Sequence, residues 1–118
     1  GTLAMKQAGQ IALMPFPYTN LANSKKRPVL LLRQLDQGRD DWLVCMVSSQ
    51  LRQLHPDLDW TLRPEDEEFP ESGLKGASIV RLSRIAVLDG SLLIGQLGVI
   101  PDHRLRDLLQ RLANWIMS

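Results

Sequence analysis

The sequence has only one cysteine, so the chain cannot form an internal disulfide. This residue, Cys45, lies inside an apolar run, and we therefore expect a buried thiol in a cytoplasmic protein. The chain also lacks an apolar run as long as a membrane span, and we expect neither a signal peptide nor a membrane partner. Aromatic residues make up only 5% of the chain. We therefore assign Phe16 and Tyr18 to packing in preference to stacking on a base.

Residues that bind metals are equally scarce. The chain has two histidines, His55 and His103, and neither belongs to a recognisable pattern of metal ligands. We therefore predict that the protein has no metal site and no cofactor.

The net charge is only +1, which by itself excludes a strongly basic nucleic-acid-binding protein, but the charges are unevenly spread. Residues 55–72 hold seven of the thirteen acids against one base, Arg63. Bases gather elsewhere, in the run Lys25-Lys26-Arg27 and in the pair Arg81 and Arg84. If the fold brings these two groups together they form a positive face for a polyanion; otherwise they are solvated surface charges.

A chain of 118 residues is long enough for one domain with its own core and too short for two ordinary ones. Residues 1–4 have the character of a cloning remnant, with Met5 as the natural start. We therefore expect a single domain over residues 5–118.

The pattern between residues 25 and 50 predicts a β-hairpin. Residues 29–32 and 42–47 are rich in β-branched and large apolar side chains, and a polar turn centred on residues 37–38 separates them. Antiparallel pairing about this centre sets Arg27 beside Ser48, unless a bulge shifts the register. A guanidinium and a hydroxyl at the mouth of a hairpin make a plausible phosphate site.

Other stretches predict further short strands. An apolar strand over residues 10–14 ends at two prolines, and the polar loop that follows, residues 18–24, is expected to lie over the site. Residues 58–62 are a possible short strand and 63–72 an exposed loop. A strand over residues 77–88 is expected to turn at Asp89-Gly90 and return over 92–94.

The end of the chain predicts a helix that begins near Pro101 or Asp102. An apolar stripe recurs at helical spacing and should pack on the sheet, with Trp115 beside it; its members are Leu105, Leu108, Leu109, Leu112 and Ile116. Five or six short strands and one terminal helix predict a mainly β fold, a strongly bent β-barrel with the helix against it.

Several short motifs occur in an order that is similar to that of the MazF/PemK toxin family. The similarity extends from about Gly9 to the terminal helix. The motifs are Gly9-Gln10-Ile11, Pro15-Phe16-Pro17, Lys26-Arg27-Pro28-Val29-Leu30, Val47-Ser48-Ser49-Gln50, Ser72-Gly73-Leu74 and Ser78-Ile79-Val80-Arg81-Leu82.

This resemblance implies a β-barrel related to the SH3-like fold, as in CcdB and MazF toxins. It implies a homodimeric toxin of a type II toxin–antitoxin system, a metal-independent, sequence-specific endoribonuclease that cleaves single-stranded RNA or mRNA. It also implies a cognate antitoxin whose acidic and apolar tail occupies the RNA groove. By position, Arg27 and Ser48 match the catalytic residues and Arg81 a further arginine that some members use. The expected RNA-binding residues are Lys25, Lys26, Ser49, Gln50, Arg81 and Arg84.

Two departures from the family pattern keep alternatives open. Many members carry an aspartate where this chain has Ser83, and some use a histidine in the first long loop, which this chain lacks. A non-catalytic RNA-binding module therefore stays possible. A CcdB-like inhibitor of DNA gyrase is the other alternative, against which the Arg27 and Ser48 pair argues. Ser48 has the alternative role of satisfying backbone at a strand end, and Arg81 that of a surface salt bridge to the acidic segment.

Overall fold

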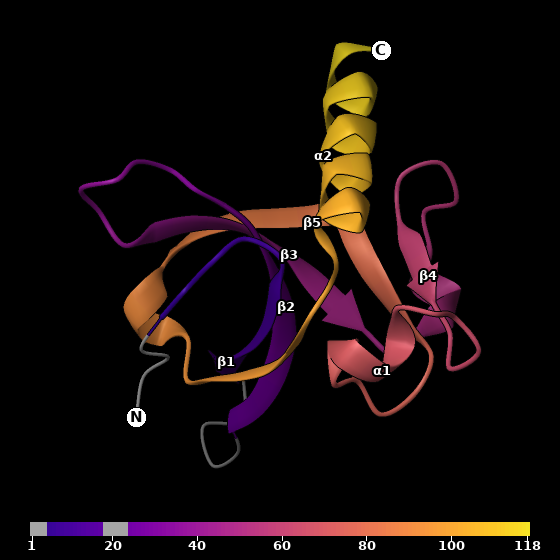
Figure 1. Cartoon of the computed structure of the whole chain (residues 1–118), viewed down its shortest axis with the longest axis horizontal. Coiled ribbons are helices and arrows are strands. Elements are labelled where there is room, and N and C mark those ends of the chain that lie inside the picture. The colour runs from indigo at the N-terminus through magenta and orange to yellow at the C-terminus, as the bar shows by residue number, and fades with distance from the viewer. Residues whose placement is uncertain (1–4, 18–23) are drawn as a thin grey trace.

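The computed structural model describes residues 5–17 and 24–118, with the side chains of residues 16, 17, 24 and 25 left out. The expected remnant at residues 1–4 and most of the expected loop over the site therefore lie outside the described residues. Within them, six strands form one antiparallel sheet in the order β4-β5-β3-β2-β1-β6. The sheet curls into a half-barrel and α2 rises from it (Figure 1). The predicted mainly β fold with a C-terminal helix is confirmed.

The elements follow one another along the chain with short connections. The strands are β1 (Gln10–Pro17), β2 (Ser24–Gln34), β3 (Asp41–Ser48), β4 (Trp60–Leu62), β5 (Ser78–Asp89) and β6 (Gly95–Val99). The helices are α1 (Phe69–Ser72), α2 (Asp102–Met117) and the 3₁₀ turns η1 (Leu51–Gln53) and η2 (Gly90–Leu92).

Strands β2 and β3 form the predicted hairpin. Val29 pairs with Met46 and Leu30 with Cys45, which is the register expected from a turn centred on residues 37–38. A bulge between residues 31 and 33 shifts the pairing by one residue, but only on the side nearer the turn. Continued two residues past Val29, the undisturbed register sets Arg27 opposite Ser48.

The two faces of the sheet carry separate apolar clusters because neighbouring residues of a strand point to opposite sides. Leu30 and Leu32 belong to the cluster that also holds the buried leucines of α2, whereas Val29 and Leu31 belong to the other. Cys45 lies in the first cluster and is fully buried, as expected. Burial, with a smaller contribution from the charge of Asp59, raises the pKa of the Cys45 thiol.

The predicted stripe of α2 packs on the sheet for most of its length. Leu105, Leu108 and Leu112 are buried, but Ile116 is 62% exposed and Trp115 is 48% exposed. The prediction that Ile116 belongs to the packed stripe is wrong, because the last turn of α2 projects beyond the sheet (Figure 1). No helix in the described part of the chain is long and apolar enough to cross a membrane.

The predicted hairpin at Asp89-Gly90 is wrong. The Asp89 carboxylate accepts a hydrogen bond from the backbone N–H of Ser91 at 2.9 Å, so the dipeptide begins η2 instead of a tight turn. The chain then crosses to the far edge of the sheet, where β6 pairs with β1 and not with β5.

Two more segments differ from expectation. The stretch predicted as an exposed loop contains α1, whose Ser72 is buried. The strand β1 continues through Pro15 and Pro17 because β6 pairs only with residues 10–13, which leaves the prolines next to an open edge.

Candidate active site

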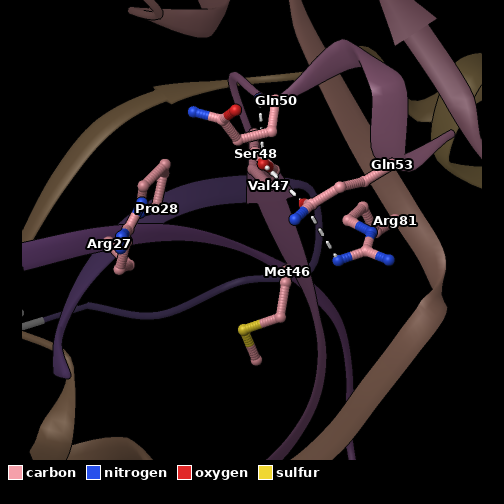
Figure 2. Close-up of a pocket in the computed structure, with 8 residues that line it drawn as sticks. All are labelled: Arg27, Pro28, Met46, Val47, Ser48, Gln50, Gln53 and Arg81. Carbon is pink, nitrogen blue, oxygen red and sulfur yellow. Dashed lines mark hydrogen bonds between the residues drawn. The ribbon is translucent and has the colours of Figure 1, made fainter. Parts of the chain in front are cut away.

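A hollow of about 440 Å³ lies across β2, β3 and β5 (Figure 2). The described residues that line it include two arginines and no acid, so its electrostatic character favours an anion. The lining residues are Arg27, Pro28, Met46, Val47, Ser48, Gln50, Gln53 and Arg81.

Strand register brings three of these side chains to one face of the sheet. β3 lies between β2 and β5, so Ser48 lies between Arg27 on one neighbour and Arg81 on the other (Figure 2). Arg81 pairs directly with Met46, which is two residues before Ser48 and therefore shares its face. The sheet thus presents a hydroxyl flanked by two guanidinium groups.

The Ser48 hydroxyl is held by two neighbours (Figure 2). Its oxygen accepts a hydrogen bond from the backbone N–H of Gln50 at 3.0 Å, and it donates to the side-chain Oε1 of Gln53 at 3.2 Å. The first bond matches the alternative role predicted for Ser48, in which its hydroxyl satisfies a backbone group at the end of a strand. The residue also lines the hollow.

Arg81 donates from Nη1 to the same oxygen of Gln53 at 3.3 Å. Its Nε is buried and has no hydrogen-bond partner among the residues that the structure describes. Over the same residues Arg81 forms no ion pair, so the alternative of a salt bridge to the acidic segment is not observed.

A second hollow, of about 370 Å³, adjoins the first and shares Arg27 and Ser48 with it. It adds the cations Lys26 and Lys75, with Ser49 on its wall, and again no acid among its described lining residues. The two hollows together form a cationic groove, defined here by the residues that line them. Such a groove suits a chain of successive phosphates.

The structure brings most of the predicted site residues to this cationic groove. Arg27, Ser48, Gln50 and Arg81 line the first hollow, and Lys26 and Ser49 the second. The side chain of Lys25 lies outside the described residues. Arg84 lines neither hollow, because β5 bulges away from β3 between Arg81 and Ile85. The catalytic and RNA-binding roles of these residues stay predictions.

The sequence analysis missed several lining residues, of which two have long polar side chains, Gln53 and Lys75. Gln53 reaches the first hollow from η1, and Lys75 reaches the second from the segment after α1. The available signals were weak: Lys75 directly follows the motif Ser72-Gly73-Leu74, and Gln53 lies in a polar stretch without periodicity.

Ser83, at a position where the resemblance implies an aspartate, has a partner away from the groove. The carboxylate of Asp59, which is 4% exposed, accepts hydrogen bonds from the Ser83 backbone N–H at 2.9 Å and from its hydroxyl at 3.0 Å. It also accepts one from the backbone N–H of His55 at 2.9 Å. Over residues 5–17 and 24–118, no group of three His, Cys, Asp or Glu side chains is arranged to hold a metal ion.

Comparison with known proteins supplies a family and a fold. The model of the family described as PemK-like, MazF-like toxin of type II toxin-antitoxin system matches residues 7–116. No curated protein matches the sequence. The solved structure of a mycobacterial endoribonuclease in complex with its cognate antitoxin is similar, with a TM-score of 0.66. The match covers 93% of both chains at 15% sequence identity, so it bears on the fold.

Proposed function

Because the chain belongs to the family of PemK-like, MazF-like toxins of type II toxin–antitoxin systems, we propose that it is a metal-independent endoribonuclease that cuts single-stranded RNA at short sequences. One observation carries the proposal: Arg27, Ser48 and Arg81 reach one hollow from three neighbouring strands, with no acid among the described residues lining it. The structurally similar mycobacterial protein, described as an endoribonuclease, supports the same activity.

Cleavage uses the 2′-hydroxyl of RNA as the nucleophile. The 2′-oxygen bonds to phosphorus and its proton passes to solvent, while the bond from phosphorus to the 5′-oxygen breaks and that oxygen takes up a proton. Negative charge builds on the phosphate oxygens in between. Arg27 is the residue that holds this charge, since preorganised cationic donors aimed at developing charge are often the largest catalytic contribution. Arg81 adds a second cation across the hollow.

The test is to incubate the purified chain with a long single-stranded RNA in the presence of a chelator and to look for discrete fragments. We expect Arg27→Ala to slow cleavage by about 10²–10³-fold, the usual effect of removing one donor to a developing oxyanion. Arg106→Ala is the matched control, because Arg106 is exposed on α2 and lines neither hollow.

Circular dichroism should show that both variants keep the fold. Near-normal cleavage by Arg27→Ala would remove this residue from the active site. If the folded wild-type chain binds RNA without cutting it, the non-catalytic module is the correct function. If it neither binds nor cuts RNA, inhibition of DNA gyrase is the next assay.

The proposed function includes two protein partners. The mycobacterial relative is described in complex with its cognate antitoxin, and the cationic groove here suits the acidic tail of such a protein.

We also propose a homodimer, because Trp115, Ile116 and Met117 leave the end of α2 apolar and exposed. Light scattering that gave a monomer at micromolar concentration would contradict the dimer. We propose a cytoplasmic location, because the proposed substrate is cellular RNA and because the free, buried thiol of Cys45 is typical of a reducing compartment.

A further inference from the structure

The side-chain amide of Gln53 receives two hydrogen bonds on one oxygen, and elementary chemistry fixes their directions. A guanidinium carries only donors, so the Gln53 atom that faces Nη1 of Arg81 at 3.3 Å must be the oxygen. The same oxygen lies 3.2 Å from Oγ of Ser48. Since an amide oxygen has no hydrogen to donate, the Ser48 hydroxyl must donate its one hydrogen bond to Gln53.

The remaining valences of Ser48 then follow. A hydroxyl has one proton and two lone pairs, and the backbone N–H of Gln50 takes one lone pair at 3.0 Å. Ser48 is left with a single lone pair, so in this arrangement it can accept a hydrogen bond from a ligand but cannot donate one. The oxygens of an ionised phosphodiester only accept hydrogen bonds, whereas the 2′-hydroxyl of RNA can donate one.

We therefore propose that Gln53 is a positioning residue that accepts the hydrogen bond of the Ser48 hydroxyl and thereby leaves Ser48 to accept a hydrogen bond from the 2′-hydroxyl of RNA. The inference rests on the proposed ribonuclease function and assigns separate tasks within it. Ser48 orients the nucleophile, and the two arginines on either side hold the phosphate.

Gln53 also holds Arg81 in place. In the described part of the chain, the bond to Gln53 is the one side-chain hydrogen bond that Arg81 makes, and its buried Nε contributes none. Gln53 is itself fixed locally, because η1 begins directly after Gln50 and the Gln53 backbone N–H donates to the Gln50 carbonyl at 3.0 Å. Both side-chain bonds of Gln53 are long and exposed, as is common before a substrate tightens such contacts and excludes water.

Two substitutions at position 53 separate a positioning role from a merely structural one. Gln53→Met keeps the length of the side chain and removes the acceptor, so we expect kcat to fall about tenfold, the effect of one hydrogen bond to a charged group. Gln53→Glu keeps an acceptor at the same place, so kcat should stay near the wild-type value. Its negative charge in the cationic groove should instead raise KM.

The assignment of the 2′-hydroxyl is tested by binding. Arg27→Ala serves as the background, to slow cleavage during the measurement. Fluorescence anisotropy then compares an RNA oligonucleotide with its analogue that carries a 2′-deoxy nucleotide at the mapped cleavage site. The 2′-deoxy analogue should bind several-fold more weakly. Adding Ser48→Ala or Gln53→Met should remove most of this difference, because the acceptor is then lost or no longer oriented.

The matched control is Gln110→Met. Gln110 is an exposed glutamine on α2 whose side chain bonds Asn114 at 2.9 Å, far from the cationic groove in sequence and absent from its lining. This variant should change neither kcat nor KM. Circular dichroism and thermal melting accompany each variant.

The outcomes distinguish the two proposals. A wild-type chain that does not cut RNA overturns the proposed function, and the inference with it. If the chain cuts RNA but Gln53→Met has normal kcat, or if Gln53→Glu loses as much kcat as Gln53→Met, the positioning role fails alone. If Ser48→Ala weakens the RNA and the 2′-deoxy analogue equally, Ser48 contacts phosphate and the assignment of the 2′-hydroxyl is wrong.

Discussion

Ser83 gives the clearest prediction at the scale of a single residue. Its hydroxyl donates to the buried carboxylate of Asp59, so Ser83→Ala should lower the free energy of unfolding by about 1.5–3 kcal/mol, the value of a hydrogen bond to a charged group. Ser83→Asp should cost more, because it loses the same bond and brings a second negative charge toward Asp59. Urea denaturation measures both variants.

A double-mutant cycle identifies the cause. In an Asp59→Asn background the extra cost of Ser83→Asp over Ser83→Ala should largely disappear, because the repulsion is gone. If Ser83→Asp is instead stable and increases RNA cleavage, position 83 belongs to the catalytic machinery and its bond to Asp59 is incidental.

The juxtaposition of two site residues was predictable from the pattern of the strands only where it depends on regular pairing. Arg27 and Ser48 follow from one turn centre, because the bulge of the β2–β3 hairpin lies on the turn side of their pairing. Arg84 was grouped with Arg81 by sequence proximity, and a bulge in β5 separates them. Gln53 was missed because a 3₁₀ turn, which has no sequence period, carries it to the hollow.

At the scale of elements, the contact between α1 and β6 depends on glycine. A Cβ built on Gly98 would lie 2.2 Å from the backbone oxygen of Glu71, and one on Gly73 would lie 2.0 Å from that of Leu97. Gly73 also has φ of +71°, a conformation that favours glycine after a helix. Since Gly73 and Leu97 line the second hollow, this close approach shapes part of the cationic groove.

We expect Gly98→Ala to destabilise the fold by about 1–3 kcal/mol, the typical cost of forcing an extra carbon into a packed site. Gly95→Ala in the same strand is the control, because its added Cβ would meet nothing within 4 Å. Chemical denaturation of the two variants measures the difference. Equal stabilities would show that α1 shifts freely and that the contact does not constrain β6.

Elements with a strong local pattern were predicted and those with distant partners were not. The helix α2 was predictable from its apolar stripe, because Leu105, Leu108 and Leu112 recur at helical spacing and are buried against the sheet. The strand β6 was missed because Gly98 packs against α1 and the strand forms its hydrogen bonds with β1, and both partners are far away in sequence. The short helix α1 lies in a stretch with prolines and acids that locally indicates a loop.

At the scale of the whole molecule, the two signs of charge are kept apart. The acids of the stretch 55–72 are partly engaged elsewhere: Asp59 binds Ser83, and Glu68 pairs with Arg104 of α2 at 2.7 Å. The cationic groove, by contrast, has only bases among its described charged lining residues. A net charge of +1 therefore conceals a local positive potential that any polyanion can use.

This separation predicts that one groove serves both RNA and an acidic antitoxin tail. A peptide with the acidic and apolar character of such a tail should slow RNA cleavage competitively, and its binding should weaken as salt rises, because exposed charges are screened beyond a Debye length of about 8 Å at physiological ionic strength. A peptide of the same composition with its acids replaced by amides is the control and should neither bind nor inhibit. Titration of each peptide into the cleavage assay at two salt concentrations measures the effect. If the acidic peptide binds the chain without slowing cleavage, it occupies a different surface, and the groove containing Arg27 is reserved for RNA.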